Sequence, residues 1–338
     1  MSRPTELESG RRTIVAAFGG NSVTRSKERG TYAEQLANVR VMCEEVLPLV
    51  RAGHRIVIIH GNGPQVGSLA LQTEAGKALG VPDQPFDVLG AMTQGQIGYL
   101  IQQTLGNLLR EDATKVRGDG GSAPHEAPTV ASVVTQVLVD PADPAFGHPT
   151  KFIGPFYDRK LAQSLAAEKG WTVVQDADRG WRRVVPSPHP IEVIEAAAIR
   201  ALISAGSIVV AGGGGGVPVV RETNGCLRGV EAVIDKDLAA EKLAALVGAD
   251  TLLLITGVRR ISLDYGKPNQ RSLDVMTLDE ARRYQAEGQF PPGSMGPKVE
   301  AAIRFLEDGG TEAIVTAAEV LAAALRGTDG TRIVQMPR

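Results

Sequence analysis

The sequence is poor in several features that mark particular classes of protein. Two cysteines, Cys43 and Cys226, stand among 338 residues, too few for a disulfide framework. Aromatic residues make up only 4 % of the chain, which disfavours a broad aromatic interface. No stretch reaches the roughly 18 apolar residues of a membrane-spanning helix, and residues 1–12 lack the apolar core of a signal peptide. We therefore expect a reduced, cytoplasmic protein with no membrane partner, in which residues 1–12 form a flexible N-terminus.

Neither sign of charge is in excess, and several common site motifs are missing. The chain has 36 basic and 38 acidic side chains and a formal net charge of −2, which excludes a strongly basic surface for nucleic acid. Its five histidines lack the spacing of zinc ligands, so we expect no metal site built by the protein itself. No G-x-S-x-G elbow of the α/β hydrolases and no G-x-x-x-x-G-K-[ST] phosphate loop is present.

Glycine, by contrast, is abundant. It accounts for 39 of the 338 residues, about 11.5 %, against a usual value of roughly 7 %. Several of the glycines stand directly after apolar segments, where the lack of a side chain lets the backbone approach a ligand closely. Together with the shortage of large side chains, this favours recognition of a ligand by the backbone.

Short apolar segments alternate with helical patterns along the chain. One apolar stripe at helical spacing runs from Leu36 to Val50, and another from Ile191 to Ile203. Continuous apolar strands separated by helices predict a largely parallel α/β sheet covered on both faces, which binds ligands at the carboxyl ends of its strands. We expect buried strands at residues 13–18, 54–60, 130–140, 207–211, 251–256 and 313–316.

Two segments interrupt this alternation. Residues 141–181 contain a predicted helix near 158–169 and a predicted strand at 171–174, and we interpret them as an inserted lobe. Residues 118–128 form a loop rich in glycine and proline, to which we assign no chemistry.

Three glycine turns follow predicted strands. Gly19 and Gly20 come directly after the first strand, where they bind an anion or form a plain tight turn, two interpretations that stay equally open. The second strand ends in His60-Gly61-Asn62-Gly63-Pro64, which predicts free amides at a helix start, a site for anions. Gly212–Gly216 follow a later strand; a flexible linker has this composition, but between two apolar segments a phosphate cradle is favoured.

Two lysines stand where a purely structural role predicts none. Asp235 is a natural N-cap, so Lys236 falls in the first turn of a helix. Pro297 marks another helix start and places Lys298 directly behind it. A cation at a helix N-terminus opposes the helix dipole by roughly 0.3–1 kcal/mol. We interpret the pair as compensated by a bound anion, with phosphoryl oxygens as the natural choice.

Four long motifs occur in the order HGNGPQVG at 60–67, TKFIGP at 150–155, VEAVIDKD at 230–237 and SMGPKVEAA at 294–302. Together with the glycine turns they resemble the carbamate kinases, a branch of the amino acid kinase family, over about residues 13–333. The resemblance implies a three-layer α/β/α sandwich across residues 13–338, a small protruding subdomain at 140–181, and a homodimer. It also implies reversible phosphoryl transfer between ATP and carbamate, giving ADP and carbamoyl phosphate and running towards ATP in catabolism, with Mg²⁺ bridging the nucleotide phosphates.

Matched motif by motif, the resemblance also implies roles for individual residues, with Asp235 orienting the lysines. The implied catalytic residues are Lys151, Asp235, Lys236 and Lys298. Carbamate and the moving phosphate would contact Gly19, Gly20, Asn21, Gly61, Asn62 and Gly63. The nucleotide would border Gly213, Gly214, Gly215, Gly216, Thr256 and Met295.

Some residues depart from the family pattern. Ser22 replaces the usual alanine after the first glycine turn, and Arg259 and Ser262 stand where an acidic and an aromatic residue are usual near the nucleotide. The first strand lacks the lysine of many relatives in the wider family, a gap that Lys151 of the inserted segment would fill. Two alternatives stay open: a kinase of another small carboxylate or phosphate acceptor, and a non-catalytic nucleotide or metabolite sensor.

Overall fold

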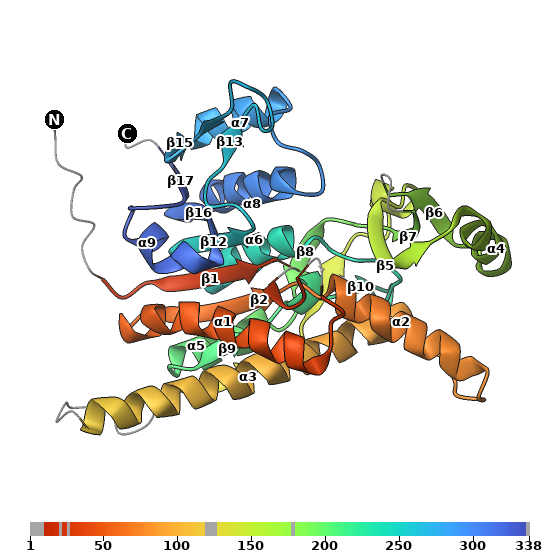
Figure 1. Ribbon diagram of the computed structural model, residues 1–338, viewed down its shortest axis with the longest axis horizontal. Coiled ribbons are helices and arrows are strands. Elements are labelled where there is room, and N and C mark those ends of the chain that lie inside the picture. Colours follow the sequence, from red (N-terminus) through yellow and green to blue (C-terminus); the bar gives the residue numbers. More distant parts are fainter. Residues whose placement is uncertain (1–9, 20–21, 26–27, 119–126, 177–179, 336–338) are drawn as a thin grey trace.

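A computed structural model describes residues 10–19, 22–25, 28–118, 127–176 and 180–335, and its centre is an eight-stranded sheet (Figure 1). The strand order is β15-β17-β16-β12-β1-β2-β9-β3. All neighbouring strands run parallel except β16 and β17, so the largely parallel sheet is confirmed. The strands are β1 (Thr13–Phe18), β2 (Arg55–His60), β3 (Val130–Ser132), β9 (Ile208–Val210), β12 (Thr251–Thr256), β15 (Val275–Thr277), β16 (Glu312–Ala317) and β17 (Thr331–Val334).

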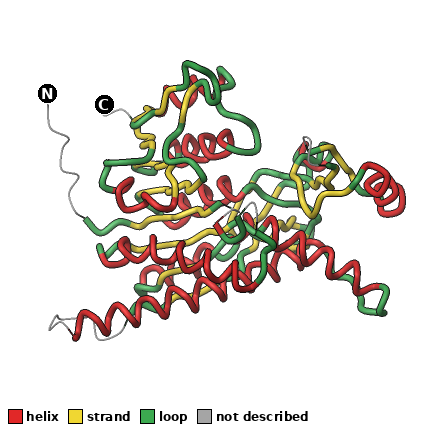
Figure 2. The backbone as a smooth tube through the Cα atoms, viewed as in Figure 1, coloured by secondary structure: helices red, strands yellow, loops and turns green. Residues whose placement is uncertain are grey.

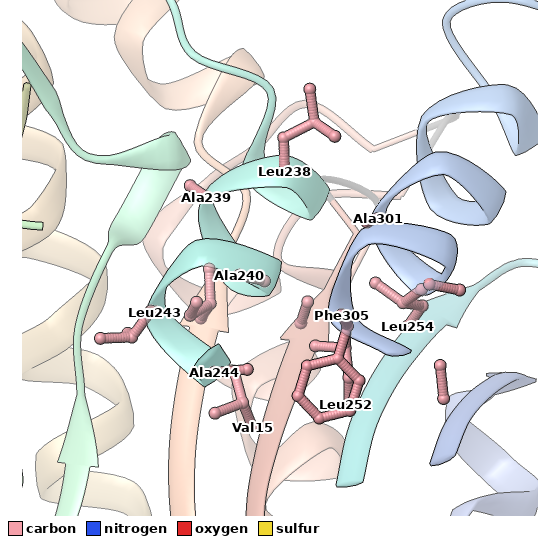
Figure 3. Packing of buried hydrophobic residues seen from close by; sticks show 14 of the residues in the cluster. Val15, Leu238, Ala239, Ala240, Leu243, Ala244, Leu252, Leu254, Ala301 and Phe305 are labelled. Carbon is pink, nitrogen blue, oxygen red and sulfur yellow. The ribbon is translucent and has the colours of Figure 1, made fainter. Parts of the chain in front are cut away.

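Helices cover both faces of this sheet because its central strands are apolar on both sides (Figure 2). On one face α1 (Tyr32–Arg51), α3 (Phe86–Gly118) and α9 (Leu321–Leu325) form one core cluster with the strands. On the other, α5 (Ala196–Ser204), α6 (Lys236–Val247), α7 (Leu278–Ala286) and α8 (Met295–Glu307) form a second. In Figure 3, Phe305 of α8 lies beside Leu252 of β12, and Leu243 of α6 belongs to the same cluster. The layers are those of the predicted α/β/α sandwich.

A second sheet, in the order β11-β10-β4-β8, corrects one predicted strand. Residues 130–140 were expected to form a single strand, but the chain leaves the central sheet after β3 and enters the second sheet at β4. The break lies at Thr135, whose backbone N–H donates to the Gln94 side chain of α3 and not to a neighbouring strand, while its hydroxyl accepts from the Gly212 amide. The strands are β4 (Gln136–Val139), β8 (Pro190–Val193), β10 (Val217–Arg221) and β11 (Leu227–Gly229).

The helical stripe expected from Ile191 to Ile203 is also corrected. Its first part is strand β8, in which Ile191 is 50 % exposed, and only the later part is helix α5. An exposed β-branched residue at the edge of a sheet and an apolar residue of a helix look alike in a short window of sequence.

A third, antiparallel sheet projects from the body beside α2 (Gly63–Lys77), as Figure 1 shows. It consists of β5 (Lys151–Tyr157), β7 (Trp181–Val185) and β6 (Thr172–Gln175), with α4 (Arg159–Lys169) packed on it. The predicted helix near 158–169 and strand at 171–174 are confirmed to within a residue or two. The boundaries 140–181 for a subdomain stay a prediction, and β7 extends beyond them. Strands β13 (Ser262–Leu263) and β14 (Arg271–Ser272) form a separate two-stranded antiparallel sheet.

Within the part of the chain that the structure describes, no helix combines the length and the apolar character needed to cross a bilayer.

Candidate active site

A cavity of about 790 Å³ opens where β1, β2 and β12 end. This is the edge at which a parallel sheet is expected to bind ligands. Its wall includes most of the residues singled out from the sequence: Gly19, Gly61, Asn62, Gly63, Lys151, Gly214, Asp235, Lys236, Thr256, Met295 and Lys298. Two further candidates, Gly20 and Asn21, lie outside the described residues.

The turn after β2 brings an uncapped helix start to the cavity. Helix α2 begins at Gly63, with Asn62 as its N-cap and Pro64 in its first turn, as predicted. The Asn62 side chain makes no capping hydrogen bond to its own helix. The first amides of α2 are therefore left for another acceptor, and the positive end of the helix dipole favours an anion there.

Two lysines and one aspartate form a nearly sealed cluster on the opposite wall. Nζ of Lys236 lies 2.8 Å from Oδ1 of Asp237, and Nζ of Lys298 lies 2.7 Å from Oδ2 of the same carboxylate. All three side chains are at most 14 % exposed. They come together because α6 and α8 pack side by side on the central sheet, each with its first turn at the cavity.

The charges of this cluster do not cancel. Burial favours the neutral form of Asp237, but the two lysines outweigh it and lower its pKa to about 2. Burial, and then the charge of Lys236, lower the pKa of Lys298. Burial also disfavours the charged form of Lys236, yet Asp237 and Asp235 raise its pKa. One carboxylate thus faces two cations, and an incoming anion would complete the balance.

Asp235 was expected to orient the lysines, and the one whose ammonium group it contacts directly is Lys151. One oxygen of Asp235 caps α6 by accepting from the Asp237 amide, and the other lies 2.7 Å from Nζ of Lys151 on β5. Lys236 and Lys298 are oriented by Asp237, which the sequence analysis did not single out. The signal was present in VIDKD, since a carboxylate in the first turn beside an N-cap lies on the same helix end as Lys236.

The pentaglycine segment is closely packed against neighbouring atoms, and its role as a phosphate cradle stays a prediction. A Cβ on Gly213 would lie 2.3 Å from Nε2 of His60, and one on Gly216 would lie 2.3 Å from the Val137 side chain. Gly215 is equally confined, by the carbonyl of Ile234. Of the four glycines proposed as nucleotide contacts, Gly214 is the one that lines the cavity, and it does so beside Asn62.

Thr256 and Met295, next to which the family resemblance puts the nucleotide, line the cavity together with Phe290 and Ser262. Arg259 is not part of this wall. Its guanidinium is 60 % exposed and pairs loosely with Glu319 and Asp329 at 3.8 and 3.7 Å, beside a shallower depression of about 360 Å³. The departure from the family pattern at Arg259 therefore lies at the rim.

The fold and this cavity define the protein as a member of the amino acid kinase family. The family model matches residues 12–317, and the chain belongs to this family. Its relatives include the carbamate kinases of Thermococcus kodakarensis, 51 % identical over 95 % of this chain and 99 % of the relative, and of Pyrococcus horikoshii, 49 % identical over 95 % and 98 %. A carbamate kinase from Giardia lamblia bound to AMP-PNP superposes with a TM-score of 0.87 at 40 % identity, covering 97 % of this chain and 99 % of that one.

Proposed function

We propose that the protein is a carbamate kinase, which transfers a phosphoryl group reversibly between ATP and carbamate to give ADP and carbamoyl phosphate. The observation that supports this most directly is the convergence of Lys151, Lys236 and Lys298 on one cavity at the strand ends. Phosphoryl transfer needs little covalent help from a protein. Positioning and neutralisation of the equatorial oxygens supply most of the acceleration.

The proposal assigns a different role to each wall of the cavity. The glycine turns at Gly19 and Gly61 and the start of α2 hold carbamate and the moving phosphoryl group through backbone amides. Lys236 and Lys298 neutralise the charge that develops on the phosphoryl oxygens, and Lys151 approaches from the protruding sheet. Thr256 and Met295 border the nucleotide.

Magnesium enters this proposal as part of the nucleotide substrate. Among the described residues, no group of three or more His, Cys, Asp or Glu side chains is arranged to hold a metal ion. The two aspartates of the cavity, Asp235 and Asp237, already accept hydrogen bonds from lysines. The oxygen ligands that Mg²⁺ prefers are therefore those of the nucleotide phosphates and water.

Formation of ATP from carbamoyl phosphate and ADP tests the proposal. We expect turnover that requires Mg²⁺ and ADP. A chain that binds ADP but makes no ATP across a range of pH and divalent metal would contradict it. In that case a panel of small carboxylates with ATP, read out as ADP release, separates a kinase of another acceptor from a sensor without turnover.

Homodimer formation and a cytoplasmic location are also proposed, on the family resemblance. Light scattering coupled to size-exclusion chromatography tests the first, because a monomer at micromolar concentration would contradict it. Fractionation of the source cells tests the second.

A further inference from the structure

The side chain of Asn62 is held in one orientation by a residue outside the cavity wall. Its Nδ2 lies 2.8 Å from Oγ1 of Thr93, a fully buried residue of α3. The Thr93 hydroxyl in turn lies 2.6 Å from the carbonyl oxygen of Gly90, one helical turn earlier. Asn62 thus makes its side-chain hydrogen bond to a neighbouring helix and leaves its own helix uncapped.

The Gly90 carbonyl decides the direction of both hydrogen bonds. A carbonyl can only accept, so the single proton of the Thr93 hydroxyl is donated to Gly90. Oγ1 must then accept from Asn62, and only the NH₂ group of Asn62 can donate. The chain of contacts therefore distinguishes the nitrogen of the Asn62 amide from its oxygen, a choice that the shape of the amide alone does not make.

The amide oxygen of Asn62 is consequently turned towards the cavity. Asn62 lines the cavity wall, and none of the described residues donates a hydrogen bond to its Oδ1. That oxygen is also not among the buried polar atoms without a partner, so it reaches open space. Gly214 packs against the face of the amide, since a Cβ there would lie 2.3 Å from Nδ2 and 2.6 Å from Oδ1.

We infer that Thr93 is a positioning residue that makes Asn62 present a hydrogen-bond acceptor to the substrate, and that this acceptor selects carbamate and carbamoyl phosphate through their amino group. The inference rests on the proposed function and specifies how its substrate is chosen. The amino group of carbamoyl phosphate donates N–H bonds. Acetyl phosphate has a methyl group at the same place and would leave the amide oxygen unpaired, a mismatch that costs about tenfold in kcat/KM.

The test compares the two acyl phosphates in ATP formation from ADP. We expect the wild type to prefer carbamoyl phosphate, and the ratio of the two kcat/KM values measures this preference. If acetyl phosphate turns over too slowly, its inhibition constant replaces its kcat/KM. Thr93→Val removes the hydroxyl and keeps the shape. It should lower the preference about tenfold through carbamoyl phosphate alone, leaving acetyl phosphate within about twofold. Thr93→Ser keeps the hydroxyl and should keep the preference.

Asn62→Ala provides the second arm, and it replaces Thr93→Val if that variant does not fold. The alanine variant should lose the same preference, and adding Thr93→Val to it should change the ratio no further, since Thr93 acts through Asn62. Equal losses for both acyl phosphates in Thr93→Val, or a wild type with no preference, would overturn the inference and leave the proposed function intact. A wild type that makes no ATP from carbamoyl phosphate would overturn the proposed function, and the substrate inferred here with it.

Discussion

The two walls of the cavity hold their cations in different ways. On the wall built by α6 and α8, Lys236 and Lys298 share one buried carboxylate, and all three groups are at most 14 % exposed. On the wall built by the protruding sheet, Lys151 is 34 % exposed, and among the described residues its ion pair is with Asp235. The first wall rests on the large core beneath the central sheet, whereas the second contacts the body through a small apolar cluster with α2 and the start of α3.

We call Lys236 and Lys298 the fixed cations, because they are buried and held by Asp237, and Lys151 the exchangeable cation, because it is partly exposed and can change partner. Desolvated cations that cannot move away from the phosphoryl group act without reorganisation at the moment of transfer. Lys151 is 34 % exposed, so water screens its pairing with Asp235 more than it screens the buried pairs of Lys236 and Lys298, and Lys151 can exchange Asp235 for a phosphoryl oxygen more readily. The buried wall should therefore dominate catalysis, and the protruding wall should modulate it.

Lys298→Met gives the largest expected effect. It removes one fixed cation and leaves Lys236 and Asp237 as a balanced pair, so the chain should fold. We expect kcat for ATP formation to fall about 10³-fold, the scale of losing one pre-organised group that stabilises transition-state charge. Steady-state kinetics measures this, with Lys267→Met, an exposed lysine, as the control. A loss below tenfold would contradict the ranking of the two walls.

Lys151→Ala should have a smaller effect, about 10²-fold in kcat, because solvent already screens this cation. The matched control is Lys160→Ala, an exposed lysine of α4 on the same sheet. If Lys151→Ala costs as much as Lys298→Met, both lysines act as one unit and the distinction between fixed and exchangeable charge fails.

The sequence predicts some residues of the cavity better than others. The strands that place the cavity are continuous apolar segments, and both lysines of the buried wall follow helix-start signals, so local patterns were enough to find them. Asp237 was missed because its role depends on α6 and α8 meeting side by side, a contact between residues 61 positions apart. The ligand role of the pentaglycine segment stays a prediction, because a glycine needed for close packing and one needed for a ligand have the same local sequence.

Helix α6 carries a second buried acidic residue, Glu241, whose side chain is 1 % exposed. One of its side-chain oxygens has no hydrogen-bond partner among the described residues. Burial, together with nearby Asp308, raises its pKa to about 7, against the opposing charges of Lys242 and Arg304. Since the ordinary pKa is 4.5, the folded chain keeps a proton that the unfolded chain releases between about pH 4.5 and 7. The free energy of unfolding should therefore fall as pH rises through this window, by roughly 3 kcal/mol.

Glu241→Gln removes this titration. We expect the variant to be more stable than the wild type at pH 8 and close to it at pH 5, measured by urea denaturation at both values. Glu287→Gln, at an exposed glutamate, is the control, and its difference in stability from the wild type should be the same at both pH values. A difference between Glu241→Gln and wild type that does not change with pH would show that Glu241 stays ionised in the fold.

Gly67→Ala tests the attachment of the protruding wall and should have the smallest effect. A Cβ at Gly67 of α2 would lie 3.0 Å from Cα of Gly154, so β5, which also carries Lys151, must move by a few tenths of an ångström. We expect kcat/KM to fall about fivefold, equivalent to about 1 kcal/mol. Gly95→Ala, at a helical glycine with open space around it, should leave activity unchanged.

The same substitution can show whether the displacement acts through Lys151. In a Lys151→Ala background, Gly67→Ala should cost almost nothing, because the group whose position it disturbs is already gone. If the two losses simply add, the α2–β5 contact supports activity through some other part of the cavity. Non-additivity would show that one glycine contact sets where the exchangeable cation lies, while the fixed pair on α6 and α8 needs no such adjustment.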